Sequence, residues 1–102
     1  MSILHTVNKT PAQRDALRSC LAHVLPGSAV LLLEDGVYAG IEGTEGAGWL
    51  ARCHSDVALF ALEGDLRARA VRPERLLRRV KPVGYRDFVE LAAAHDAVQA
   101  WL

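Results

Sequence analysis

Cys20 is the residue of this chain whose type and setting are most suited to chemistry. It lies in the middle of the segment "RDALRSCLAHVL", residues 14–25, which reads as an amphipathic helix. A thiol that a partner can reach is a nucleophile in its thiolate form, and it would make the protein a handler of sulfur. A free cysteine is also among the residue types most often buried, so Cys20 as a small packing residue is the alternative. The segment leaves both interpretations open.

The helical periodicity of the segment predicts a border position for Cys20. Leu17, Leu21 and Val24 form the apolar stripe, and Cys20 lies about 60° to one side of its centre. His23, three residues later, favours the thiolate when protonated, whereas the dipole at a helix C-terminus disfavours an anion. The second cysteine, Cys53 in "ARCHSD", directly precedes an apolar strand pattern. We therefore expect Cys20 to be more accessible and more reactive than Cys53.

A basic segment extends from Arg67 to Arg86. It contains eight basic residues against one acid, Glu74, which gives it a net charge of +7 within a chain that is neutral overall. A solvated helix face explains such a run, and so does a docking surface for an acidic partner protein or for RNA. Because the segment lacks the interleaved aromatic residues that stack on bases, protein docking is favoured and direct RNA contact is not expected.

No other catalytic or ligand-binding pattern stands out. The glycines of "GIEGTEGAG" have the wrong spacing for a phosphate loop, and Glu42 and Glu45 would repel an anion, so a mobile surface loop is predicted there. The two cysteines are not spaced as zinc ligands, and the four histidines do not pair with carboxylates at ligand spacing. The sequence therefore predicts no metal site and no cofactor.

The elements that would position these residues alternate between strands and helices. Apolar strands are predicted over residues 2–7, 29–33 and 57–62, with a short edge strand in "VKPVG", residues 80–84. Helices are predicted from a Thr10–Gln13 capping box to about Val24, in a short turn after Asp35, as a turn in "WLARCH", after Asp65, and from Asp87 through His95.

Strands that are apolar throughout and separated by helices indicate right-handed crossovers in a mainly parallel sheet. The expected fold is a compact α/β domain over residues 1–102, with three layers in the order α/β/α. Functional residues of such sheets gather at the carboxyl ends of the strands. Here that edge includes residues 7–9, 34–38 and 63–65.

The composition is that of an ordinary soluble protein, with 51% hydrophobic residues, 24% charged residues and no net charge. No apolar run is long enough to cross a bilayer, and "MSILHTVNK" has no basic segment ahead of an apolar stretch, so neither a membrane span nor a signal peptide is expected. The cytoplasm is the predicted compartment, where both cysteines are thiols.

Four blocks of the sequence together resemble the DsrH/TusB family. They are "ILHTVNK" at the start, "LLLEDGVYAG" after the first helix, "ALEGDLRARAV" after the third strand and "YRDFVELAAAHDAVQAWL" at the end. The resemblance covers nearly the whole chain and keeps the order and spacing of the blocks. It implies a DsrE/DsrF/DsrH-like α/β fold and the smallest of three homologous subunits of a heterohexamer, DsrEFH or TusBCD.

The resemblance implies sulfur relay through cysteine persulfides, towards 2-thiolation of the wobble uridine of tRNA or in the oxidation of stored sulfur. The implied partners are DsrE/TusD-like and DsrF/TusC-like subunits and a downstream TusE/DsrC-like acceptor. DsrH-type members carry a cysteine in the first helix, and "RSCLAHV" places Cys20 in the matching block. Nothing in the family pattern matches Cys53.

Two functions of different classes follow for the chain. In the first, Cys20 is a persulfide carrier, a thiolate that accepts a sulfane sulfur and passes it to a second thiol. In the second, the chain is a non-catalytic assembly subunit that completes the heterohexamer, since the principal acceptor cysteine of such complexes belongs to the DsrE/TusD subunit. A flavodoxin-like binder of small ligands is a third reading, but the chain lacks a phosphate-binding loop.

Overall fold

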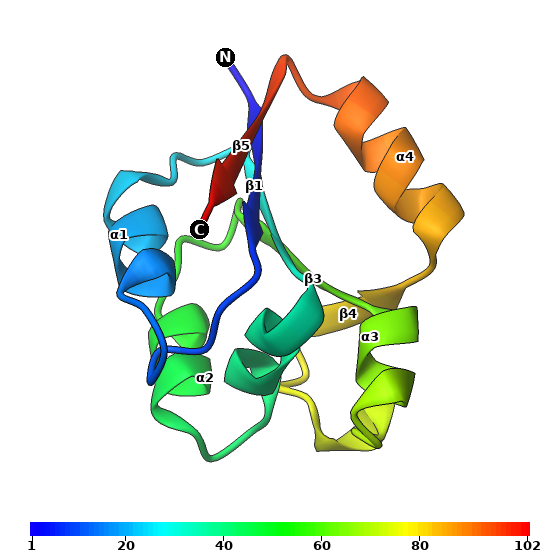
Figure 1. The fold of residues 1–102 in the computed structure, drawn as a ribbon. Helices are drawn as coiled ribbons and strands as arrows, with labels where there is room; N and C mark the ends of the chain where they lie inside the picture. The colour runs from blue at the N-terminus through cyan, green and yellow to red at the C-terminus, as the bar shows by residue number, and fades with distance from the viewer.

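All five strands of the protein run parallel in one sheet. The computed structural model describes residues 1–102, and the strand order is β4-β3-β2-β1-β5 (Figure 1). The strands are β1 (Ile3–Val7), β2 (Ala29–Leu32), β3 (Ala58–Leu62), β4 (Val80–Val83) and β5 (Ala97–Trp101). The helices are α1 (Ala16–His23), α2 (Glu45–Ala51), α3 (Glu63–Ala68) and α4 (Tyr85–Ala94), with 3-10 helices η1 (Glu34–Gly40) and η2 (Pro73–Arg75).

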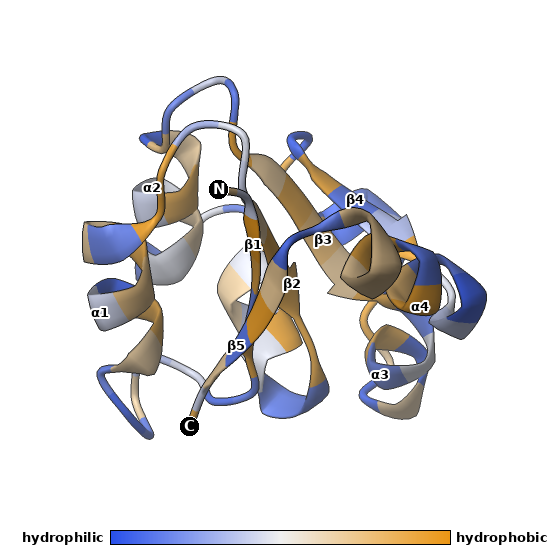
Figure 2. Cartoon of the chain, turned by 90° about the horizontal axis from the view of Figure 1, so that it is seen from above, coloured by the Kyte–Doolittle hydropathy of each residue, from blue (hydrophilic) through white to orange (hydrophobic).

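The order of the strands decides which helices share a layer. From β1 to β4 the chain steps three times in the same direction across the sheet. Right-handed crossovers therefore place the helices of these connections on one face. The last connection returns from β4 at one edge to β5 at the other, so α4 lies on the opposite face (Figure 2). The expected parallel α/β fold with helices on both faces is confirmed.

The two faces of the sheet have cores of unequal size. Alternate residues of a strand point to opposite faces, so Val30 and Leu32 join the larger core whereas Ala29 and Leu31 join the smaller one. The larger core contains 16 buried residues, contributed by the sheet, α1, α2, η1 and α3. Only three residues are fully buried in the smaller core, beneath Phe88, Leu91 and Ala92 of α4.

The helix starts differ from those expected. The Thr10–Gln13 box forms, since the Gln13 side chain accepts from the Thr10 amide at 2.9 Å, but it closes a separate turn and α1 begins only at Ala16. Asp87 does not open α4. It is the third helical residue, and its carboxylate accepts a hydrogen bond from the amide of Gly84, the N-cap, at 2.9 Å. Asp35 and Asp65 do not cap the helices expected to follow them, because η1 and α3 begin before these residues.

The sequence pattern predicted only the end of α2, as a turn in "WLARCH", and it did not predict β5. The glycine segment is not a loop throughout, because Thr44 caps α2 by accepting from the Ala47 amide at 3.1 Å. The end of the chain forms β5, which pairs with β1 along its whole length. "AVQAW" has little of the apolar continuity of the other strands because β5 is an edge strand, and three of its five residues are exposed.

One arginine of the basic segment is a structural residue. The Arg79 guanidinium donates to the carbonyl oxygens of Cys53 at 2.6 Å and Val57 at 3.0 Å, and also to that of His54. These carbonyls belong to the connection between α2 and β3. Arg79, which directly precedes β4, thus supplies donors to this connection, in which the His54 carbonyl also accepts from a nearby amide, that of Val57.

We expect Arg79→Met to lower the free energy of unfolding by about 2–4 kcal/mol, because it removes charge-assisted hydrogen bonds and leaves partly buried carbonyls without donors. Urea unfolding followed by circular dichroism measures the loss. The matched control is Arg78→Met at the neighbouring exposed position, where a change within about 0.5 kcal/mol is expected. Equal effects of the two variants would contradict the structural role of Arg79.

Candidate functional site

Cys20 lies in the larger core of the protein, and the border position predicted for it is wrong. Its side chain has 0% exposure, and it shares the buried face of α1 with Ala16 and Leu17. Leu21 and Val24, the expected centre of the stripe, are only partly buried. The reason is tertiary: α1 packs against α2 as well as against β1 and β5, so its buried face is turned from the direction that the apolar pattern indicates.

Burial also determines the acidity of this thiol. Removal from water raises the pKa of Cys20 to about 12, and the nearby Cys53 contributes to the rise. At pH 7 the thiolate is then on the order of one molecule in 10⁵. In this conformation Cys20 is neither accessible nor ionised, so it has the properties of a packing residue.

Cys53 is the more accessible of the two free thiols. It follows the C-terminus of α2, is half-buried, and its sulfur lies 3.9 Å from the carbonyl oxygen of Trp49. Burial raises the pKa of Cys53, while the positive charge of Arg79 opposes the rise. The order of accessibility is therefore the reverse of the expected one.

We expect a maleimide or iodoacetamide to label Cys53 well before Cys20 in the folded chain, because alkylation needs an exposed thiolate. Peptide mass spectrometry at successive times gives the two rates. Faster labelling of Cys20 would show that α1 opens in solution. As an independent check, Cys20→Ser should cost about 1–3 kcal/mol through a buried hydroxyl, whereas Cys53→Ser should cost less than about 1 kcal/mol.

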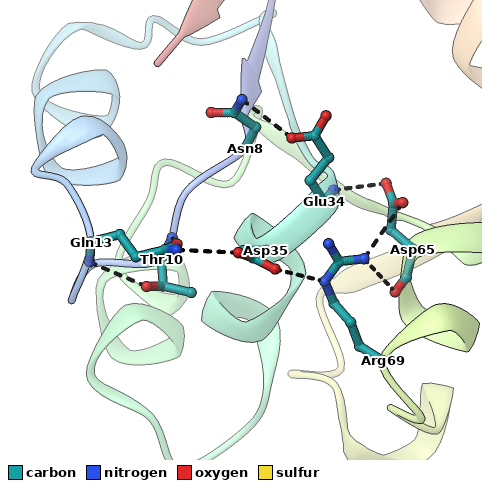
Figure 3. Close-up of polar contacts among 7 residues, drawn as sticks. All are labelled: Asn8, Thr10, Gln13, Glu34, Asp35, Asp65 and Arg69. Carbon is teal, nitrogen blue, oxygen red and sulfur yellow. Dashed lines mark hydrogen bonds and ion pairs between the residues drawn. The ribbon is translucent and has the colours of Figure 1, made fainter.

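The carboxyl ends of β1, β2 and β3 carry a network of polar side chains (Figure 3). The Asn8 amide donates to Glu34 at 3.4 Å, and the Asp65 carboxylate accepts from the backbone N–H of Glu34 at 2.7 Å. The three predicted stretches of the sheet edge thus meet, as expected for a parallel sheet. The side-chain oxygen of Asn8 is buried without a partner.

Arg69 is the cation of this strand-end network. It donates to Asp35 at 2.9 Å and lies 3.7 Å from a carboxylate oxygen of Asp65. The hydrogen bond from Arg69 holds the pKa of Asp35 below its usual value, with a smaller effect from Gln13. Arg69 is part of the basic segment, but its charge is neutralised here by Asp35, which is distant in sequence, and by Asp65, one helical turn earlier.

The network is held close to the sheet by a small residue. A Cβ atom at Gly36 would lie 2.2 Å from the backbone carbonyl oxygen of Val7, so only glycine allows η1 to pass directly over the end of β1. This close approach positions Glu34 and Asp35 beside Asn8 and Arg69. The network is consequently a pre-formed structural junction between three strand ends.

A second polar contact joins the C-terminus to the first strand. Trp101 of β5 donates its indole N–H to Nδ1 of His5 at 3.0 Å, and the ring of His23 on α1 lies 5.7 Å from the Trp101 ring, centroid to centroid. His5 is 3% exposed. Because its Nδ1 is the acceptor, a proton on that atom would eliminate the hydrogen bond. Neutral His5 therefore holds the end of β5 beside β1, its neighbour in the sheet.

Burial lowers the pKa of His5, and the charges of His23 and His95 lower it further. The unfolded chain then binds this proton more readily than the folded chain. The stability that neutral His5 contributes is complete above the unfolded pKa of 6.5 and is lost as the pH falls through the lowered folded pKa.

We accordingly expect the urea midpoint to fall between pH 7 and pH 5 by more in the wild type than in His5→Gln, whose side-chain carbonyl still accepts from Trp101. Unfolding curves at several pH values measure the two slopes. His54→Gln, at an exposed histidine, is the control and should keep the wild-type slope. Parallel slopes for the wild type and His5→Gln would contradict the role assigned to His5.

No group of three His, Cys, Asp or Glu side chains is arranged to hold a metal ion, and no helix has the length and apolar character needed to span a membrane. By fold the chain belongs with small parallel α/β proteins of known structure. It matches the crystal structure of the ychN protein from E. coli with a TM-score of 0.79, 16% identity and coverage of 98% of both chains. A protein of unknown function from Methanobacterium thermoautotrophicum gives a TM-score of 0.74 at 18% identity, covering 96% of this chain and 97% of that one.

The sequence comparisons are more specific. The family model described as "DsrH like protein" matches residues 9–98. Protein TusB of Serratia proteamaculans is 33% identical over 99 residues, and Protein TusB of Photorhabdus laumondii is 36% identical over 101 residues. Each match covers 97% of this chain and all of the relative. The chain therefore belongs to the DsrH/TusB family, as its sequence blocks indicated. Membership of this family makes the chain a subunit of a multi-subunit sulfur relay in tRNA thiolation, with TusC-like and TusD-like partners.

Proposed function

We propose that the chain serves its relay complex as an assembly subunit, and that Cys20 is a packing residue that carries no sulfur. The observation that supports this proposal is the complete burial of Cys20 together with a pKa of about 12. A persulfide relay needs a thiolate that a donor and an acceptor can both approach. The sulfur itself would then pass through a cysteine of a TusD-like subunit to a TusE-like acceptor and on to the wobble uridine.

The surface supports an assembly role. Val98 of β5 is 49% exposed although its neighbour across the strand pair, Leu4, is fully buried, so the edge of the sheet carries uncovered apolar area. Tyr85 and Val89 of α4 are 72% and 52% exposed. Val37 of η1 is fully buried and does not contribute to this surface. Burial of such residues against homologous subunits would complete a heterohexamer.

Cys20 as a persulfide carrier is the second candidate, and the proximity of the two thiols favours it. Cys53 packs against the same core as Cys20, so a second thiol that could take over the sulfur lies near it, although the charge of Cys53 adds to the raised pKa of Cys20 and opposes its ionisation. The Cys20 thiolate would attack the outer sulfur of a donor persulfide. The donor S–S bond would break, the donor would leave as a thiolate, and Cys20 would hold the new S–S bond. This step requires α1 to move away from α2 and the sheet.

The experiment compares Cys20→Ala with Cys53→Ala in the complex co-expressed with its two homologous subunits. Under the assembly proposal, both variants assemble and retain 2-thiouridine in tRNA within about twofold of the wild type. Under the carrier alternative, Cys20→Ala loses thiolation, and treatment of the wild-type complex with polysulfide adds about 32 Da, one sulfur atom, to the Cys20 peptide.

Assembly is tested separately by light scattering of the co-expressed subunits. A single peak containing all three chains is expected, and elution of this chain apart from its partners would contradict the proposal.

We also propose the cytoplasm as the compartment, since both cysteines are free thiols and a reducing environment keeps them so.

A further inference from the structure

A hollow with an apolar lining lies between α3 and η2, beside the helix that also carries Asp65 of the strand-end network. It has a volume of about 410 Å³, in the range of small binding pockets. Leu66, Val71 and Pro73 provide the apolar lining. Arg67 and Arg72 flank it, and Glu63 lines it as well.

The walls of the hollow are fixed by the core. The chain reverses after α3, where the Val71 amide donates to the Leu66 carbonyl at 2.9 Å and Ala70 has a left-handed backbone with φ of 55°. Leu66 and Val71 are 2% and 7% exposed and both belong to the larger core. The backbone positions of Arg67 and Arg72 are therefore set by a turn that is anchored at two points.

The charge at this site is not neutralised within the chain. Of the eight basic residues between 67 and 86, Arg69 is paired with carboxylates and Arg79 is bonded to backbone carbonyls. The other six are exposed and take part in no ion pair: Arg67, Arg72, Arg75, Arg78, Lys81 and Arg86. Two of these six are the ones beside the apolar hollow.

We propose that this hollow docks an acidic segment of a partner protein, in which an apolar side chain is flanked by two carboxylates. The apolar side chain would pack against Ala70 and Pro73, the exposed apolar residues of the lining, and the carboxylates would pair with Arg67 and Arg72. A guanidinium and a carboxylate form paired, directional hydrogen bonds, so two arginines on either side of one turn favour a segment with two acids. The proposal is independent of whether Cys20 carries sulfur.

The lining of the hollow favours protein over RNA. No aromatic side chain lines it, so bases have no surface on which to stack. Glu63 would repel a chain that carries a phosphate at every residue, whereas a peptide can place its two acids next to the arginines and away from Glu63. Apolar residues together with two cations match an acidic–apolar–acidic peptide in chemical character.

The test uses the full chain labelled with ¹⁵N and two synthetic peptides as probes, Gly-Asp-Leu-Glu-Gly and its leucine-to-glycine analogue, both blocked at their ends. We expect saturable shifts of the Ala70 and Val71 amide signals with the first peptide and binding about tenfold weaker with the analogue. The Arg67→Glu/Arg72→Glu variant should lose the binding. The control Arg78→Glu/Arg86→Glu, which has the same change in net charge, should keep it.

A charge exchange makes the experiment decisive. Arg67→Glu/Arg72→Glu should bind Gly-Lys-Leu-Lys-Gly, which the wild type does not bind, and this gain also shows that the variant is folded. Three results would overturn the proposal: no saturable shift with millimolar peptide, equal loss in the two double variants, or tighter binding of a single-stranded oligouridine that depends on Arg67 and Arg72. The last result would assign the hollow to RNA.

Discussion

The pairing of β5 with β1 is the interaction on which the rest of this structure depends. It joins the two ends of the chain, with the Asp96 carboxylate accepting from the Ser2 amide at 2.8 Å and the Asp96 amide donating to the Ser2 carbonyl at 3.0 Å. Because β5 lies beyond β1, the last crossover must return across the sheet, which places α4 on the opposite face from α1. The same pairing brings Trp101 to His5 and against the core that encloses Cys20.

The arginines of the basic segment divide into three physical roles. Arg69 neutralises carboxylates that meet at the strand ends, and Arg79 donates to carbonyls of the connection between α2 and β3. The exposed remainder has no intramolecular partner. The net charge of +7 over the segment therefore overestimates the positive charge that is available for binding. It also does not show where on the surface that charge lies. Only Arg67 and Arg72 stand beside an apolar hollow, where charge and shape can act together.

The burial of Cys20 bears directly on the role of this chain within the sulfur relay of its family. A sulfur relay requires at least one accessible thiolate, but not one in every subunit. A cysteine enclosed between α1, α2 and the sheet stabilises the fold by packing, and it would need a conformational change before any exchange. The uncovered apolar residues of α4 and β5 are consistent with a subunit whose contribution is the surface that it offers to its neighbours.

The sequence by itself determined the parallel α/β class, the first four strands to within one or two residues, and the family. The strands follow from continuous apolar runs such as 29–33 and from helix-breaking residues such as Pro26 and Gly27. The family follows from blocks of sequence that can be recognised without any knowledge of tertiary contacts. Only the tertiary structure decided the state of Cys20, the strand character of "AVQAW" and the tasks of Arg69 and Arg79. A helical wheel assumes that a helix is buried in one direction only. Because α1 is covered by both α2 and the sheet, the wheel did not predict that Cys20 is buried. These features form only when distant segments of the chain meet. β5 needs β1 as its partner, Arg69 needs the Asp35 carboxylate, and Arg79 needs the carbonyls before β3.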